Sequence, residues 1–145
     1  MTSRERVLAA LAHREPDRVP LDLGGTFVTS IAATSLHHLR RRLGLEERPV
    51  KVYDAYQMLG EVEMDLVERF HLDCLPVEPP ALTMGLRREG WKPWRLMDGT
   101  EVLMPGRFDV TVTPEGDWLF SPNGDNSRPP TCRMPAGGHP AGGRP

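Results

Sequence analysis

Cysteine, net charge and long apolar runs are all scarce in this sequence of 145 residues. Two cysteines, Cys74 and Cys132, are too few for the disulfide framework of a small secreted protein, which favours a reducing compartment. With 18 Lys and Arg against 20 Asp and Glu, the formal charge of −2 offers no electrostatic footprint for nucleic acid or an anionic membrane. The longest apolar run, Val7 to Ala12, is too short for a membrane span or a signal sequence. We therefore expect a cytoplasmic protein that binds neither nucleic acid nor membrane.

Glycine and proline, by contrast, are abundant, with 14 and 15 residues respectively. They are concentrated in residues 121–145, which end in two copies of a five-residue unit, AGGHP and AGGRP. Such a segment lacks the apolar content that would offset its ordering entropy. We predict three regions: 1–90 with β/α units, 91–120 with a β-hairpin insert, and a Gly/Pro-rich disordered tail over 121–145.

Helices and short strands are predicted to alternate in the first region. Thr2 and Glu5 have the spacing of a capping box, and Gly44 has the position of a residue that ends a helix. The expected helices cover residues 2–13, 29–43 and 59–70, and the expected strands cover 19–23, 50–53 and 72–77. The order α-β-α-β-α-β is typical of a parallel sheet covered by helices.

Two antiparallel hairpins are predicted after residue 90. Asp98-Gly99 is a strong two-residue turn signal, and Pro114-Glu115-Gly116 marks a second turn. The flanking strands are expected at 94–97 with 100–103, and at 108–113 with 117–120. Trp94 and Trp118 are expected to pack across these strands.

Two adjoining segments at the start of the chain form a motif: 4–11 reads RERVLAAL, and 13–20 reads HREPDRVP. Further pieces follow in order, namely VKVYD at 50–54, FHLD at 70–73, DGT at 98–100 and MPAGG at 134–138. Together they resemble the uroporphyrinogen decarboxylase superfamily, which includes the decarboxylase of haem biosynthesis and the cobalamin-dependent methyltransferases. The resemblance implies a (β/α)8 barrel.

The fold class that we expect is therefore α/β: the N-terminal part of a (β/α)8 TIM barrel, with an antiparallel β-hairpin insert and a disordered tail. A complete barrel needs about 250 residues, and only three strand candidates precede the hairpins. We expect a truncated family member, cut off after Gly138, whose unpaired strands favour self-association. The alternatives are an inactive fragment and a small α+β binding module without catalysis.

The resemblance also implies chemistry. In the decarboxylases two arginines after this opening bind substrate carboxylates, and the matching positions here are Gly25 and Thr29. This departure favours corrinoid-dependent methyl transfer as the parent activity, with a small-molecule substrate or a corrinoid protein as partner.

Methyltransferases of this type hold zinc through a His-x-Cys pair and a distant Cys, which this chain lacks. His71, Cys74 and Cys132 could be read as three ligands, but we interpret His71 as a helix-end cation and Cys74 as a buried strand residue. We therefore expect no metal or cofactor in this chain, and zinc and a corrinoid protein only for the full-length family member.

Three acidic residues are the catalytic candidates. Asp22, Asp54 and Glu78 lie within or directly after the predicted strands, and barrel active sites form where strands end. An acid at such a position can orient a substrate. The alternative role for each is a helix cap or a solvated loop acid.

Overall fold

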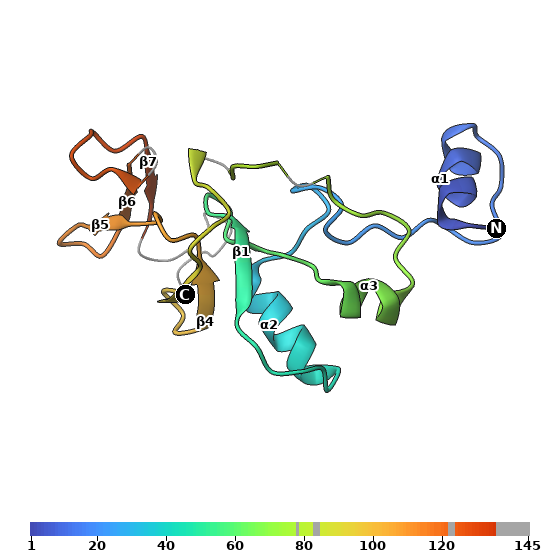
Figure 1. The fold of residues 1–145 in the computed structure, drawn as a ribbon, viewed down its shortest axis with the longest axis horizontal. Coiled ribbons are helices and arrows are strands. Elements are labelled where there is room, and N and C mark those ends of the chain that lie inside the picture. Colours follow the sequence, from blue (N-terminus) through green and yellow to red (C-terminus); the bar gives the residue numbers. More distant parts are fainter. Residues whose placement is uncertain (78, 83–84, 122–123, 136–145) are drawn as a thin grey trace.

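The computed structural model describes residues 1–77, 79–82, 85–121 and 124–135. The helices are α1 (Ser3–Leu11), α2 (Ala33–Arg42) and α3 (Met64–Phe70). The strands are β1 (Val50–Asp54), β2 (Leu59–Gly60), β3 (Lys92–Arg95), β4 (Glu101–Met104), β5 (Val110–Val112), β6 (Trp118–Phe120) and β7 (Cys132–Met134). Figure 1 shows an elongated arrangement, with α1 at one end, β5–β7 at the other, and α2, β1 and β4 between them.

The strands form two small sheets, and the predicted partial TIM barrel is wrong. One sheet has the order β2-β1-β4-β3, and the other has the order β5-β6-β7. Among the described residues the β1–β4 pair is the one parallel pairing of named strands, and no closed barrel forms. The protein is a mixed α/β molecule of three helices and two sheets.

Two of the expected parallel strands, 19–23 and 72–77, are not strands at all. Pro20 and Pro76 interrupt these apolar runs, and a proline removes the N–H that a strand in the middle of a sheet must donate. Val19 and Val77 are accordingly 75% and 96% exposed. Instead, β4 of the first hairpin pairs in parallel with β1, at an edge where one of these two segments was expected.

The local predictions with explicit turn or cap residues are confirmed. Thr2 and Glu5 form the capping box of α1, and Gly44 follows α2 with a φ of 64°. Both hairpins form, since β3 pairs with β4 and β5 pairs with β6 in antiparallel register. The third helix begins later than predicted, because Leu59 and Gly60 pair with β1 instead.

Part of the C-terminal region that was predicted to be disordered forms a strand. β7 pairs with β6, with Cys132 opposite Phe120 and Met134 opposite Trp118. The Gly/Pro repeat at 136–145 lies outside the described residues.

The core lies where α2 packs on β1 and β2, and it continues into an aromatic cluster. The Trp94 ring meets Phe108 at 5.0 Å and Trp118 at 6.0 Å, both edge to face, and Phe108 contacts Phe120 at 5.7 Å. These rings join the two sheets. The sequence predicted that Trp94 and Trp118 pack across the strands of the hairpins; in the structure the two rings contact each other from different sheets. No helix in the described ranges is both long and apolar enough to cross a membrane.

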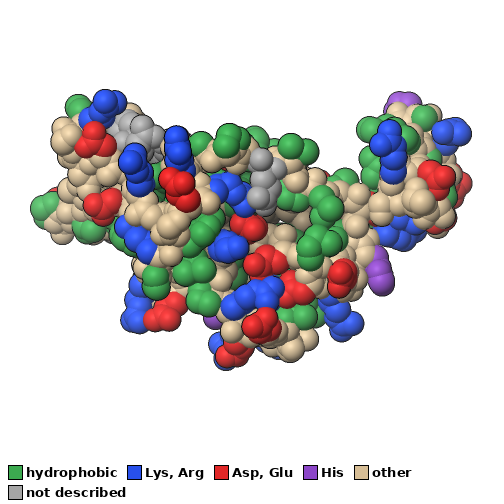
Figure 2. Space-filling model, viewed as in Figure 1, with side chains coloured by type: hydrophobic (Ala, Val, Ile, Leu, Met, Phe, Trp, Pro, Cys, Tyr) green, Lys and Arg blue, Asp and Glu red, His purple; other side chains and the backbone are tan. Residues whose placement is uncertain are grey.

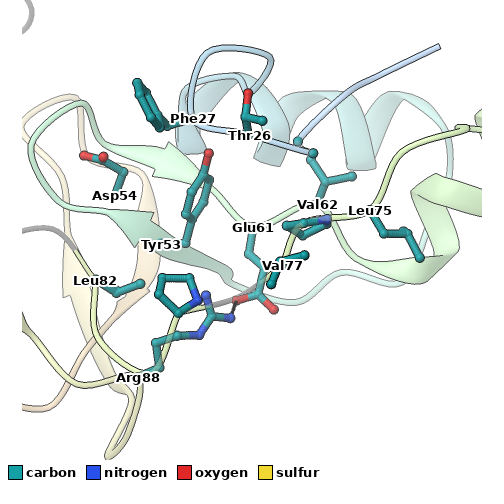
Figure 3. Close-up of a pocket in the computed structure, with 14 residues that line it drawn as sticks. Thr26, Phe27, Tyr53, Asp54, Glu61, Val62, Leu75, Val77, Leu82 and Arg88 are labelled. Carbon is teal, nitrogen blue, oxygen red and sulfur yellow. Dashed lines mark hydrogen bonds and ion pairs between the residues drawn. The ribbon is translucent and has the colours of Figure 1, made fainter. Parts of the chain in front are cut away.

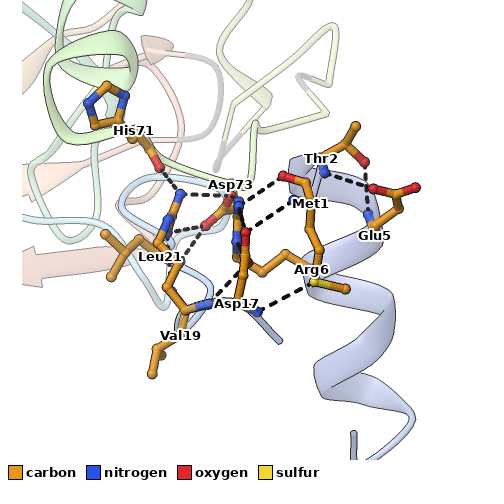
Figure 4. A network of polar contacts seen from close by, with 10 residues as sticks. Met1, Thr2, Glu5, Arg6, Asp17, Val19, Leu21, His71 and Asp73 are labelled. Atoms are coloured by element: carbon orange, nitrogen blue, oxygen red, sulfur yellow. Dashed lines mark hydrogen bonds and ion pairs between the residues drawn. The ribbon is translucent and has the colours of Figure 1, made fainter. Parts of the chain in front are cut away.

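The opening motif forms a network of ion pairs that holds α1 against the rest of the chain (Figure 4). The Asp73 carboxylate is fully buried and lies 2.5 Å from the Arg6 guanidinium and 2.7 Å from that of Arg18. Arg6 also pairs with Asp17 at 2.6 Å, and the backbone N–H of Leu21 donates to Asp73 at 2.9 Å. The motif residues thus fix the loop that leads toward residue 24.

Candidate functional site

A pocket of about 490 Å³ lies beside the end of β1 (Figure 3). The loop 24–27 forms one wall, and Tyr53 and Asp54 of β1 form another. The remaining sides are closed by residues 61–62 after β2 and by residues 75–77, 79, 82 and 88. Drug-sized ligands occupy pockets of roughly 300–1,000 Å³, so this one is large enough for a small organic molecule.

Asp22 builds the loop wall and does not itself line the pocket. Its Oδ1 accepts a hydrogen bond from the Gly25 N–H at 2.8 Å, and the Gly24 N–H donates to the Thr29 carbonyl at 3.1 Å. Gly24 has a φ of +86°, and a Cβ there would lie 2.6 Å from Cγ2 of Val62. Glycine is therefore required for the loop to close on the pocket floor.

Asp54, the second predicted acid, does line the pocket. It is 6% exposed at the end of β1, and its Oδ1 accepts hydrogen bonds from the N–H groups of Tyr56 and Gln57 at 2.8 and 2.9 Å. The carboxylate thus orders the turn after β1, which is the role of a capping acid. It also contributes a negative charge to the pocket wall.

Tyr53, which the sequence analysis did not single out, places its ring across the pocket (Figure 3). Its hydroxyl oxygen is buried and has no hydrogen-bond partner among the described residues. Burial raises the pKa of this phenol, and the nearby Ser30 hydroxyl offsets part of the effect. The charges of Asp54 and Asp22 raise the pKa further, so the group keeps its proton at neutral pH.

Glu61 and Arg88 form an ion pair at the opposite side of the pocket. The Arg88 guanidinium lies 3.0 Å from the Glu61 carboxylate, and the two side chains are 15% and 17% exposed. Neither residue was predicted, because they are far apart in the sequence and no local pattern signals their pairing. The pair balances its own charge within the pocket lining.

Glu78, the third predicted acid, lies outside the described residues. The structure therefore brings Asp22 and Asp54 to the same pocket, one behind its wall and one on its surface.

The cysteines and His71 do not fit the zinc site of the methyltransferases. In the part of the chain that the structure describes, no three His, Cys, Asp or Glu residues come together as a metal site. Burial raises the pKa of the Cys74 thiol, and the charges of Asp22 and Asp73 raise it further, which disfavours the thiolate that binds zinc.

Gly25 and Thr29, at the positions that match the carboxylate-binding arginines of the decarboxylases, make hydrogen bonds within their own loop. The Gly25 N–H donates to Asp22. The Thr29 hydroxyl accepts from the Thr26 N–H at 3.0 Å and lies 3.2 Å from the Thr26 hydroxyl. The pocket therefore offers an ordered carboxylate and an internal ion pair within a mostly apolar lining, while the oxygen of the Tyr53 hydroxyl is itself buried.

No protein-family model, no curated protein and no solved structure matches this chain.

Proposed function

We propose that the chain holds a small-molecule substrate in this pocket, as a uroporphyrinogen decarboxylase-like protein on the methyl-transfer side of that superfamily. The observation that carries the proposal is the pocket itself, with Tyr53 and Asp54 presented together at the end of β1. The opening motif supports it indirectly, because its ion pairs fix the loop that becomes the pocket wall.

Porphyrinogen decarboxylation is disfavoured by the same residues. A porphyrinogen carries several carboxylates, which bidentate guanidinium groups bind best. Gly25 and Thr29 supply none, and Arg88 is paired with Glu61. We expect no decarboxylation when the purified chain is incubated with uroporphyrinogen and the products are separated by chromatography. Turnover above that of a heat-killed control would contradict this expectation.

Substrate binding is tested with three probes in which a benzene ring carries a methylated oxygen, nitrogen or sulfur: anisole, N-methylaniline and thioanisole. Amide resonances in ¹H–¹⁵N correlation spectra of the full chain report the site. We expect saturable shifts at Gly24, Gly25 and Val62, and none at Val110 in the other sheet. Shifts that are absent at millimolar probe, or equal at both places, would refute the proposal.

A binding module without catalysis is the second candidate. It is favoured by Asp54, whose carboxylate oxygen already accepts two backbone hydrogen bonds and so serves the turn. Adding cob(I)alamin to the probe-loaded protein separates the two functions. Transfer of the probe's methyl group to cobalt would break the O–CH3, N–CH3 or S–CH3 bond, release phenol, aniline or thiophenol after uptake of a proton from water, and remove the absorbance of cob(I)alamin. Binding with no loss of absorbance over the buffer blank would assign the chain to the binding class.

A further inference from the structure

We propose that the contacts of Asp73 with Arg6, Arg18 and Leu21, which we call the Asp73 clamp, couple the docking of α1 to the binding of a ligand in the pocket. Asp73 is then a positioning residue: it touches no ligand, but it holds together the two segments that become pocket walls. The inference rests on the proposed function, because it concerns how ligand binding at that same site is controlled.

Two walls of the pocket begin within three residues of the clamp. The Leu21 N–H donates to the Asp73 carboxylate at 2.9 Å, and the Asp73 N–H donates to the Leu21 carbonyl at 2.8 Å. From this double contact one segment runs to Gly24 and the other to Leu75, the first lining residue of each. The pairing of Leu21 with Asp73 therefore sets the spacing of the two segments where they enter the pocket.

The helix α1 reaches the clamp through charged groups and not through the core. The Arg6 guanidinium lies 2.5 Å from the Asp73 carboxylate, and Arg18, in the loop after α1, lies 2.7 Å from it. No residue of α1 is among the described core residues or those packed against them. Leu8 and Leu11 are 50% and 72% exposed, and Figure 1 shows α1 at one end of the molecule. Elements with so few apolar contacts open locally while the core stays folded.

Detachment of α1 removes Arg6 from a carboxylate that has no exposed surface of its own. The side chain of Asp73 is 0% exposed, and a buried charge that loses a partner is strongly unfavourable. Asp73 regains solvation by turning toward water, which separates it from Leu21 and releases both walls. The pocket thus has its shape when α1 is docked, and a ligand that binds this shape favours the docked helix. The coupling is reciprocal, because both events stabilise the same state.

Arg6→Gln tests the coupling with anisole, a neutral probe that has no charge to interact with the clamp. Arg4→Gln is the matched control, because Arg4 lies on the same helix and is exposed. Binding to the full chain is followed by the shifts of the Gly24 and Gly25 amides. We expect Arg6→Gln to weaken anisole binding about 5-fold or more, as typical coupling between two sites does, and Arg4→Gln to leave it unchanged.

Hydrogen exchange of the unmodified chain provides the reciprocal measurement. Saturating anisole should slow the exchange of α1 amides and of the Ala12 amide, which donates to the Leu8 carbonyl at 3.0 Å. No residue of α1 lines the pocket, so direct contact with the probe does not explain such an effect. The Thr113 amide, bonded to the Asp117 carbonyl beside the other sheet, should not change. A purely structural role of Asp73 predicts that anisole leaves the exchange of α1 unaltered.

The outcomes separate this inference from the proposed function. If anisole binds equally well to Arg6→Gln, or leaves the exchange of α1 unaltered, the coupling is wrong while the pocket stands. If anisole does not bind the unmodified chain, the proposed function fails, and exchange without a probe judges the clamp. Faster exchange of the Gly24 and Gly25 amides in Arg6→Gln, relative to Thr113, then supports the clamp, and unchanged rates overturn it. If Arg6→Gln does not fold, the effect of anisole on α1 of the unmodified chain decides.

Discussion

At the scale of single residues, Asp73 shows what the opening motif does. Its buried carboxylate accepts from two arginines and from the Leu21 N–H, so it joins α1, the following loop and the end of α3. We predict that Asp73→Asn lowers the free energy of unfolding by about 2 kcal/mol. This is less than the roughly 3–5 kcal/mol that follows when a buried charge loses its partner, because Arg6 retains its ion pair with Asp17. Urea denaturation measures the change. Asp125→Asn, at an exposed pair with Arg128, is the control and should cost under about 0.5 kcal/mol.

The same carboxylate predicts how stability depends on pH. Hydrogen bonds from Leu21, Ser3, Arg6 and Arg18 outweigh the opposing effect of burial and lower the pKa of Asp73 from 3.8 to about 2. A group whose pKa is lower in the folded state stabilises the fold above its unfolded pKa and loses that contribution as pH falls toward the folded value. We therefore expect the urea midpoint of the unmodified protein to fall as the pH is lowered from about 4 to about 2. This fall should be larger than the fall in the urea midpoint of Asp73→Asn over the same pH range. Parallel curves for the two proteins would contradict this.

Two glycines with similar backbone angles test the pocket wall. Gly24 and Gly99 have φ values of +86° and +87°, but a Cβ on Gly24 would strike Val62 whereas one on Gly99 meets nothing within 4 Å. Gly99→Ala should cost about 1 kcal/mol through its backbone angle alone. Gly24→Ala should cost about 2–3 kcal/mol, because overpacking adds to the angle, and should also weaken probe binding. Equal losses in thermal or urea unfolding would show that the loop does not need its close contact with Val62.

At the scale of elements, the sequence predicts those whose signals are local. The capping box of α1 and the Asp98-Gly99 turn specify their elements within a few residues, and both form as expected. The apolar runs at 19–23 and 72–77 do not become strands, because strand formation depends on a partner edge that no local pattern encodes. β2 is the reverse case: the helical pattern from Leu59 is overridden by pairing with β1.

The residues of the candidate site also differ in whether a local sequence signal predicts them. Asp54 could be found because it ends a recognisable strand, and Asp22 because it follows an apolar stretch. Tyr53 carries no special signal on a strand, where aromatic residues are common. The Glu61–Arg88 pair joins residues 27 positions apart, and a contact over that distance in the sequence has no local pattern that predicts it.

At the scale of the whole molecule, apolar surface stays uncovered. Figure 2 shows hydrophobic side chains on the face between α1 and the central sheet. In the extended segments at 19–28 and 75–77, the large exposed apolar residues are Val19, Leu21, Phe27, Val28, Leu75 and Val77. Large apolar patches are uncommon on the surface of a monomer and are typical of an interface. The sheets add outer edges at β3, β5 and β7 that no further strand among the described residues covers, whereas the outer edge of β2 is hydrogen-bonded to the segment 31–33.

These two features together predict that the chain self-associates at micromolar concentration. Exposed strand edges and apolar segments gain by pairing with the same groups of a second copy, and the formal charge of −2 provides little repulsion. Val77→Lys should shift the sedimentation profile toward the monomer, because Val77 is 96% exposed and the lysine places a charge within the apolar face. Val112→Lys, at an exposed position of β5, tests the sheet edge separately. If association runs through the edges, Val112→Lys has the larger effect; if it runs through the apolar face, Val77→Lys does. A wild-type chain that sediments as one monomeric species from 1 to about 100 µM would contradict both routes. It would also mean that the exposed face is tolerated by a self-sufficient domain, which cooperative urea unfolding with a full-sized m-value would then confirm.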